Sequence, residues 1–461
     1  MRLSGATLNS VPAVVARPTY DRTAQAAGII HFGIGAFHRA HQAVYTDAAM
    51  NAGDRDWGII GVSLRSASVA EQMNPQDGLY TVAARSGEGV DHRLIGSVQR
   101  VLKASHEPDA VIEAVAAEAT RIISFTITEK GYCRASDGSL DLAVADDSSV
   151  YRFLNDGLSL RRERGLAGVT LLSCDNLAQN GEQLEKLLSA YLTAHDPVLA
   201  EWVKAHCSFP SSMVDRIVPA TTADDLAAAQ AALGNLEDAA HVVTEPFSQW
   251  VIEDRFVQGL PRWEAFGAEL VADVAPYETA KLRMLNGAHS ALAYLGLQRG
   301  YEFVHQAIGD DALSSLVERL MRDEAAPTID TAAGQDLMAY AGDLLERFAN
   351  PALNHRLAQI AMDGSQKIPQ RWLDTLAFHQ QRGRRCPAIL EALAVWIVHV
   401  SGTGHVVDDP MRDVLQELCG KAGNDGVARA LFGKGGLFAN HWRAESADIS
   451  QISAKLETQI L

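Results

Sequence analysis

The sequence predicts a two-domain α/β protein, with a doubly wound parallel sheet in the first domain and a mostly α-helical second domain. Up to about residue 270, short apolar runs alternate with helical stretches, which is typical of a parallel sheet covered on both faces. From Pro276 onward the chain is rich in Ala and Leu at helical spacing. A chain of 461 residues is too long for one compact core. We therefore expect domains at 1–274 and 275–461.

The elements of the first domain are expected in regular alternation. Each expected strand is a short apolar run bounded by turn-forming or charged residues. The strands are expected at 28–35, 57–64, 80–85, 92–102, 121–128 and 168–174. Helical spacing is expected after residue 35 through Met50, around 108–118, around 149–164, and again up to about Ala205.

Charge and cysteine usage narrow the possible partners. A net charge of −17 argues against nucleic acid or an anionic membrane as the main partner, although local cations can still hold an anionic small molecule. The sequence has no run of about 18 apolar residues that would predict a membrane span, and its first residues lack an apolar signal region. Five scattered cysteines without a CxxC pair favour a reduced, cytoplasmic protein.

A glycine turn after the first strand predicts a dinucleotide site of the Rossmann type. In HFGIGAFHRAHQ the backbone between strand and helix can approach a pyrophosphate, whose charge then faces the helix N-terminus. His38 stands where GxGxxG has its third glycine, so the motif alone is weak, but it follows the first strand of an alternating chain. A metal is not expected, because His38 and His41 lack a third ligand. The expected nucleotide contacts are Gly33, Ile34, Gly35, Ala36, Phe37, His38 and Arg39.

The choice between NAD and NADP is less well defined. NAD enzymes usually carry an acidic residue at the end of the second strand, where it binds the ribose hydroxyls. Here that strand ends VSLRSAS, without an acid and with Arg65, a further candidate for cofactor contact. NAD is expected, and NADP stays open.

Four polar residues interrupt an otherwise apolar helix that starts near Pro276. At 100° per residue, Glu278, Lys281, Asn286 and His289 fall within roughly 140° of arc. The alternative is a solvated stripe on an amphipathic helix. In a dry site, however, a lysine with a lowered pKa can act as general acid or base, and an asparagine amide can donate to an alkoxide. A second donor, Asn176 in SCDN, follows the end of an expected strand.

Seven segments in order resemble the polyol-specific long-chain dehydrogenases, the mannitol dehydrogenase family. They are GIGAFHRAHQAVYTD, TITEKGYC, SCDN, MVDRIVP, EPFSQWVIED, KLRMLNGAH and DGSQKIPQR. Members of that family include mannitol 2-dehydrogenase, arabinitol dehydrogenase, fructuronate reductase and tagaturonate reductase. The resemblance implies a Rossmann-type domain followed by a helical domain, catalysis by lysine without a metal, and a monomer acting on a small sugar acid or polyol.

The resemblance also assigns roles to individual residues. Lys281 matches the catalytic acid/base, Asn176 and Asn286 the pair that binds the oxyanion, and His289 the histidine that orients substrate. Glu278 and Asp215 match acidic residues near the site. Lys367 matches a substrate-binding lysine, and Thr128 of TITEKGYC is expected to contact the cofactor.

Extra cations favour a hexuronate over a hexitol. Mannitol members have TEGGYC and KIGLLNG, so Lys130 and Arg283 are additions here; they also have an arginine at the position of Gln359, whereas this chain has Arg356 one turn earlier. A hexuronate carries a carboxylate, which arginine or lysine would bind. Arg356 is the first choice for that role, Lys130 or Lys367 the second. For Arg283 a surface charge or ion pair is the better interpretation.

We therefore expect NAD(P)-dependent, reversible reduction of D-fructuronate to D-mannonate. The alternatives within the family are a neutral ketose and polyol pair, as for mannitol 2-dehydrogenase, and tagaturonate reduction. Alternatives of other classes are a catalytically silent nucleotide sensor and a metal-dependent lyase or hydrolase. The intact set of Lys281, Asn176, Asn286 and His289 speaks against the sensor.

Overall fold

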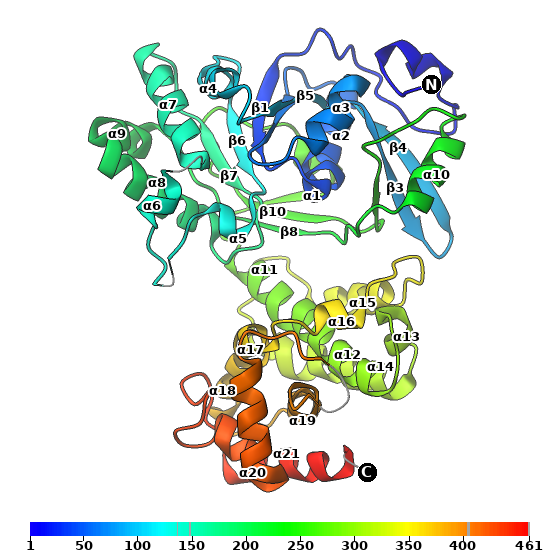
Figure 1. Ribbon diagram of the computed structural model, residues 1–461, viewed down its shortest axis with the longest axis vertical. Coiled ribbons are helices and arrows are strands. Elements are labelled where there is room, and N and C mark those ends of the chain that lie inside the picture. The colour runs from blue at the N-terminus through cyan, green and yellow to red at the C-terminus, as the bar shows by residue number, and fades with distance from the viewer. Residues whose placement is uncertain (136, 147–148, 403–405, 460–461) are drawn as a thin grey trace. The chain divides into compact units, whose positions relative to one another are not determined.

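The computed structural model describes residues 1–135, 137–146, 149–402 and 406–459 (Figure 1). It divides into two compact units, Met1–Ala275 and Pro276–Leu461, each with its own apolar core. Within the described residues, none of the helices is both long and apolar enough to cross a membrane. We describe the two units one at a time.

The first unit is built on a parallel sheet with the strand order β5-β2-β1-β6-β7. The order runs one way from β1 through β2 to β5 and the other way through β6 to β7, so it reverses between β1 and β6. This is the doubly wound arrangement, and the predicted fold class is confirmed. The strands are β1 (Ala27–Phe32), β2 (Gly58–Ser63), β5 (Val98–Lys103), β6 (Ile122–Phe125) and β7 (Thr170–Ser173).

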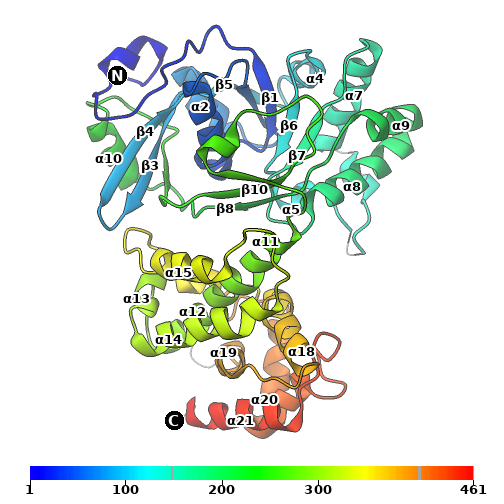
Figure 2. The same cartoon turned by 180° about the vertical axis from the view of Figure 1, so that it is seen from behind.

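Both faces of this sheet are covered, because its strands alternate apolar side chains between two clusters. On β1, Ile30 and Phe32 belong to one cluster and Ile29 to the other; on β7, Leu171 and Leu172 divide in the same way. Figures 1 and 2 show the helices around the sheet from opposite sides. The helices of this unit are α1 (Ala36–Ala40), α2 (Gln42–Asn51), α3 (Ser68–Met73), α4 (Pro108–Ala116), α5 (Thr128–Gly131), α6 (Leu142–Ala145), α7 (Val150–Glu163), α8 (Asn180–His195), α9 (Pro197–His206) and α10 (Ala223–Ala232).

The segment 80–102 differs from the prediction. The expected strand at 92–102 is two strands: β4 (Gly89–Ile95), paired antiparallel with β3 (Tyr80–Ser86), and β5, which joins the main sheet. Ser86 pairs with Gly89 across a two-residue turn, the tightest connection of a β-hairpin. The remaining strands form small sheets with the orders β4-β3-β9 and β11-β10-β8. Their bounds are β8 (Ser212–Asp215), β9 (Val242–Thr244), β10 (Gln249–Glu253) and β11 (Ala268–Val271).

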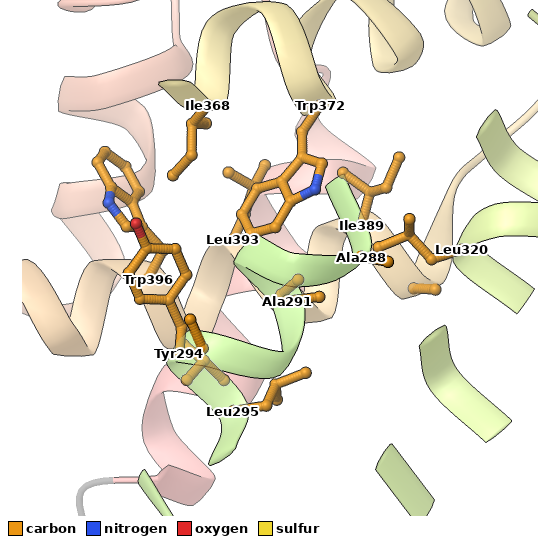
Figure 3. Packing of buried hydrophobic residues seen from close by; sticks show 14 of the residues in the cluster. Ala288, Ala291, Tyr294, Leu295, Leu320, Ile368, Trp372, Ile389, Leu393 and Trp396 are labelled. Atoms are coloured by element: carbon orange, nitrogen blue, oxygen red, sulfur yellow. The ribbon is translucent and has the colours of Figure 1, made fainter. Parts of the chain in front are cut away.

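The second unit packs helices around α12, on which every residue from Gly287 to Gly296 is buried. A helix that is apolar on all sides lies at the centre of a bundle rather than on its surface. In Figure 3, Ala288 and Ala291 of α12 pack with Trp372, Ile389 and Leu393. The helices are α11 (Ala275–Ala280), α12 (Gly287–Gln298), α13 (Val304–Ile308), α14 (Asp311–Arg319), α15 (Leu337–Phe348), α16 (Leu357–Ile360), α17 (Gly364–Ile368), α18 (Asp374–Gln380), α19 (Pro387–Val400), α20 (Arg412–Phe432) and α21 (Ser446–Gln459).

Among the described residues of this unit, three segments are π-helical: η4 (Lys281–Asn286), η5 (Leu320–Ala325) and η7 (Pro369–Leu373). A π turn closes its hydrogen bonds from i to i+5 and is uncommon, and it is frequent at functional sites. Segment η4 joins α11 to α12 and holds Lys281 and Asn286, two of the residues that the sequence analysis predicts to be catalytic.

Candidate active site

The glycine turn lies where the strand order of the main sheet reverses. Gly33 follows β1 with φ +94°, and a Cβ built on it would lie 2.1 Å from the backbone oxygen of Thr126, which follows β6. Only glycine fits there. At Gly35 the nearest atom to an added Cβ is 3.7 Å away, so the backbone is open at that point. Ligands of open α/β sheets bind at this crevice, beyond the carboxyl ends of the strands.

Of the residues that follow the turn, His38 and Arg39 lie in the interior. His38 stacks on His31 of β1 with 3.4 Å between ring centroids and is 1% exposed. The Arg39 guanidinium donates to the backbone oxygen of Ala240 and is also buried. Burial and these contacts hold both side chains within the unit, and a contact of either residue with the nucleotide stays a prediction. Ala36 and Phe37 are half-buried, whereas Ile34 is buried.

The predicted single helix from the turn to Met50 is interrupted at His41, whose φ of −122° and ψ of −98° separate α1 from α2. His41 instead packs edge-on against Trp250, with 5.3 Å between ring centroids. Among the described residues there is no cluster of three His, Cys, Asp or Glu side chains that could hold a metal ion.

The ends of β6 and β7 bring two further predicted residues to the same edge of the sheet. The register pairs Phe32 with Phe125 and Phe125 with Ser173, so β1, β6 and β7 all end at the same edge of the sheet. The segments that follow these strands therefore begin side by side. Thr128 and Asn176 are both exposed there. Parallel strands thus gather Gly33, Thr128 and Asn176 from distant parts of the chain.

Asp175, which the sequence analysis did not select, fixes this edge. Its carboxylate accepts hydrogen bonds from the backbone N–H of Ile127 at 3.0 Å and of Thr128 at 2.8 Å, and from the Tyr132 hydroxyl at 2.9 Å. Thr128 has φ +63°, an uncommon conformation for a β-branched residue, which these bonds hold in place. Burial raises the pKa of Asp175 above its ordinary value. The signal available in the sequence was the position of this acid directly after a strand.

The other predicted residues of the first unit differ in exposure. Asp215 ends β8, is 5% exposed and pairs with Gln249 of β10. Lys130 is exposed on α5, and Arg65 is exposed just after β2. Both cations are therefore accessible to an anionic ligand.

In the second unit, the π turn alters the helical geometry that the sequence analysis assumed. On a regular α-helix numbered from Glu278, Lys281 lies at about −60°, with Asn286 and His289 at about +80° and +20°. A π turn holds about one residue more, which turns every later position back by about 100°. Asn286 and His289 then lie at about −20° and −80°, so that with Lys281 they share an arc of about 60°. The insertion brings these side chains closer to one face.

His289 is held in its neutral form. It is 8% exposed, with its ring centroid 4.7 Å from that of Phe348 and 5.1 Å from that of His355. Burial, and then the neighbouring His355, Arg347 and Arg371, hold its pKa well below the ordinary 6.5. Its Nε2 has no hydrogen-bond partner within the described part of the chain. A neutral imidazole can therefore bind a hydroxyl group.

Two of the predicted substrate cations, Arg356 and Lys367, have protein partners. Arg356 donates to Glu302 Oε1 at 2.7 Å, and its side chain is 63% exposed. Lys367 donates from Nζ to the backbone oxygen of Met362 at 2.6 Å, and burial followed by the charge of Arg371 lowers its pKa. Glu278 is half-buried on α11.

Two arginines form hydrogen bonds at this turn, Arg283 from η4 itself and Arg371 from η7. Arg283 donates to the oxygen of Thr328 at 2.9 Å and to its Oγ1 at 2.8 Å, a role in local packing. Arg371 of η7 donates to the backbone oxygen of Asn286 at 3.2 Å. Arg371 lies in DGSQKIPQR, one of the segments that carry the family resemblance.

Comparison with known proteins shows the family of the chain. Two family models match the chain: the mannitol dehydrogenase Rossmann domain over residues 27–265 and the mannitol dehydrogenase C-terminal domain over 273–459. D-mannonate oxidoreductase of Escherichia coli is 42% identical over 92% of this chain and 92% of its own. Mannitol 2-dehydrogenase of Aspergillus terreus is 37% identical over 95% and 92%.

A solved structure shows the same fold over the whole chain. The ternary complex of Pseudomonas fluorescens mannitol 2-dehydrogenase with NAD and D-mannitol superimposes with a TM-score of 0.82 at 34% identity, covering 100% of this chain and 96% of that one. The chain therefore belongs to the mannitol dehydrogenase family of oxidoreductases.

Proposed function

We propose that this oxidoreductase reversibly reduces D-fructuronate to D-mannonate with a nicotinamide dinucleotide and without a metal. The observation that carries the proposal is the 42% identity over 92% of each chain to D-mannonate oxidoreductase, against 37% to mannitol 2-dehydrogenase of A. terreus. The cations Lys130, Arg356 and Lys367 are the residue types that a hexuronate carboxylate requires.

The glycine turn fits the dinucleotide. Gly33 has no room for a side chain, and Gly35 leaves the backbone open at the end of β1, as close approach of a pyrophosphate requires. When bound there, NAD supplies or accepts the hydride. NAD is favoured because the P. fluorescens relative was solved with it. NADP is the second candidate, since the residues after β2 include exposed Arg65 and no acid.

The protein's own residues would manage the proton and the developing charge. Lys281 gives a proton to the ketone oxygen as the carbon becomes an alcohol, and takes it back in the reverse direction. Asn176 and Asn286 donate to the oxygen while it carries negative charge. His289, which stays neutral, orients a substrate hydroxyl, and Glu278 and Asp215 complete the polar surroundings.

A neutral ketose and polyol pair is the second candidate function. It is favoured by the ion pair of Arg356 with Glu302, which a substrate carboxylate would have to displace. Tagaturonate differs from fructuronate only in stereochemistry and has the same charge, so it belongs in the same test.

The test is a panel of fructuronate, tagaturonate and fructose, each with NADH and with NADPH. We expect kcat/KM with fructuronate to exceed that with fructose by about 100-fold, the value of a charge-assisted hydrogen bond of 2–3 kcal/mol. Faster turnover of fructose would contradict the hexuronate assignment and support the polyol alternative.

We also propose that the protein acts as a monomer in the cytoplasm. Its five cysteines are all free thiols, as a reducing compartment favours. Light scattering should give a mass near that of one chain, 49.7 kDa; twice that mass would contradict the monomer.

A further inference from the structure

The π turn that holds Lys281 and Asn286 is braced by another π-helical segment. Within the second unit, η4 contacts both η5 and η7. Segment η7 begins at Pro369 directly after α17 and carries Arg371 and Trp372, which face the junction of η4 with α12. Figure 3 shows Trp372 beside the start of α12.

Side chains of η7 donate to both carbonyls at this junction. Arg371 Nη1 donates to the backbone oxygen of Asn286 at 3.2 Å and to Ser290 Oγ at 2.7 Å. Trp372 Nε1 donates to the backbone oxygen of Gly287 at 3.2 Å. Asn286 ends the π segment and Gly287 begins α12, so these bonds hold the helix where its hydrogen-bond pattern changes.

A charged donor is strong in this position. Burial lowers the pKa of Arg371 to about 10, so the guanidinium keeps its charge at neutral pH. Hydrogen bonds from a charged donor are stronger than those between neutral groups, and a planar guanidinium fixes direction as well as distance. A lysine would supply the charge without the fork.

We propose that Arg371 is a positioning residue for the reaction, which sets the Asn286 amide relative to Lys281 by holding the carbonyl of Asn286 and the hydroxyl of Ser290. This rests on the proposed function, in which Asn286 donates to the alkoxide. Arg371 does not touch the substrate; it acts through the π turn.

The test is a double-mutant cycle between Arg371→Met and Asn286→Ala, measured in the full-length enzyme with the best substrate of the panel above. We expect Arg371→Met to lower kcat by about 10- to 100-fold while KM for NADH changes less than about 2-fold. In the double variant the loss should stay within about 2-fold of that of Asn286→Ala alone, because both changes remove one function. The proposal would be overturned if the loss of kcat in the double variant equalled the product of the two single losses. A kcat for Arg371→Met within about 2-fold of wild type would also overturn it.

Two further variants separate positioning from stability. Arg283→Met removes a guanidinium from the same π turn that binds Thr328 instead, and it should leave kcat within about 2-fold of wild type. Arg371→Lys keeps the charge and replaces Arg371→Met if that variant does not fold. Combined with Asn286→Ala, it too should lower kcat by less than the product of the two single losses. A wild-type enzyme that turns over none of the panel would reject the proposed function itself, whereas a failed cycle in an active enzyme rejects only the role of Arg371.

Discussion

Burial decides the protonation of individual side chains in this protein. His289 keeps a depressed pKa because it lies among aromatic rings and near cations, so it remains neutral around pH 7. A neutral histidine binds a hydroxyl but gives up its proton reluctantly. Within the proposed site, the proton then comes from Lys281.

Replacing Lys281 by alanine should lower kcat by at least about 100-fold, since general acid catalysis contributes about 10²–10⁴. NADH binding, measured by fluorescence titration, should be unchanged. Lys421→Ala, a change to an exposed lysine paired with Glu417 on α20, is the matched control and should retain full activity. More than a tenth of wild-type activity in Lys281→Ala would remove Lys281 from the mechanism.

The pair of Arg356 with Glu302 provides a test of carboxylate recognition. Arg356→Gln should raise KM for fructuronate by about 10-fold or more and leave KM for fructose unchanged. Glu302→Gln frees the guanidinium and should lower KM for fructuronate by up to about 5-fold, since exposed pairs contribute up to about 1 kcal/mol. Arg299→Gln, which breaks a comparable pair with Asp310, should alter neither value. Equal effects on both substrates would point to a role in folding.

At the scale of single residues, the sequence predicted which residue types belong to the site but not which contacts they make. The resemblance selected Lys281, Asn286 and His289 from their spacing in one motif. It could not reveal that Arg39 is buried under Ala240, because that contact joins residues 201 positions apart. Asp175 and Arg371 were missed for the same reason: their partners are backbone groups in other segments.

At the scale of elements, the glycine turn combines two different requirements. Gly33→Ala should lower the free energy of unfolding by about 2 kcal/mol or more, because alanine is strained at positive φ and its Cβ would collide with Thr126. Gly35→Ala has room in the free protein, so its stability should be unchanged while nucleotide binding weakens. Urea unfolding and NADH titration of both variants check this. Equal loss of stability in the two would contradict it.

Helix α19 starts on a buried acid that should make stability depend on pH. Glu324 accepts from the backbone N–H of Ala388 at 2.8 Å and Ile389 at 2.9 Å, and burial raises its pKa from 4.5 to about 7. Because the pKa is raised in the folded state, the contribution of Glu324 to the free energy of unfolding is fully present below pH 4.5. This contribution, about 3 kcal/mol in all, is lost as the pH rises through 7. Urea titrations should show this decline between pH 5 and 8, and Glu324→Gln should remove it. The same slope in the variant would assign the pH dependence elsewhere.

Elements were predictable where their pattern was local. Helices such as α4 and α7 begin and end within about two residues of the expected positions, because their apolar spacing and caps lie in the segment itself. The run 92–102 has no comparable break in hydropathy, so β4 and β5 could not be separated. The π turn in η4 was also hidden, since a single extra residue leaves the apolar spacing helical.

At the scale of the whole molecule, two features predicted the fold class. They are the change of composition near Pro276 and the regular alternation of apolar runs with helical stretches before it. The core of each unit is separate. Because the glycine turn belongs to Met1–Ala275, ligand-dependent stabilisation should be confined to that unit.

Hydrogen exchange with and without NADH would test this. At 100 times its Kd, NADH should raise protection around β1 and β6 by up to about 2.7 kcal/mol and leave α19 unchanged. Equal gains in both units would mean that they unfold as one cooperative body.

The π turn of η4 also has a consequence for how this enzyme tolerates changes in chain length. Deleting one residue between 282 and 285 would give the segment a uniform α-helical ladder. Asn286 and His289 would each move one place back along the helix and so keep their angles of about −20° and −80°. A variant of that kind should fold well and keep these side chains on the face of Lys281, whereas straightening the π turn without a deletion would swing both by about 100°. The hydrogen-bond pattern of the turn, matched to its number of residues, therefore decides which side chains share the face of Lys281.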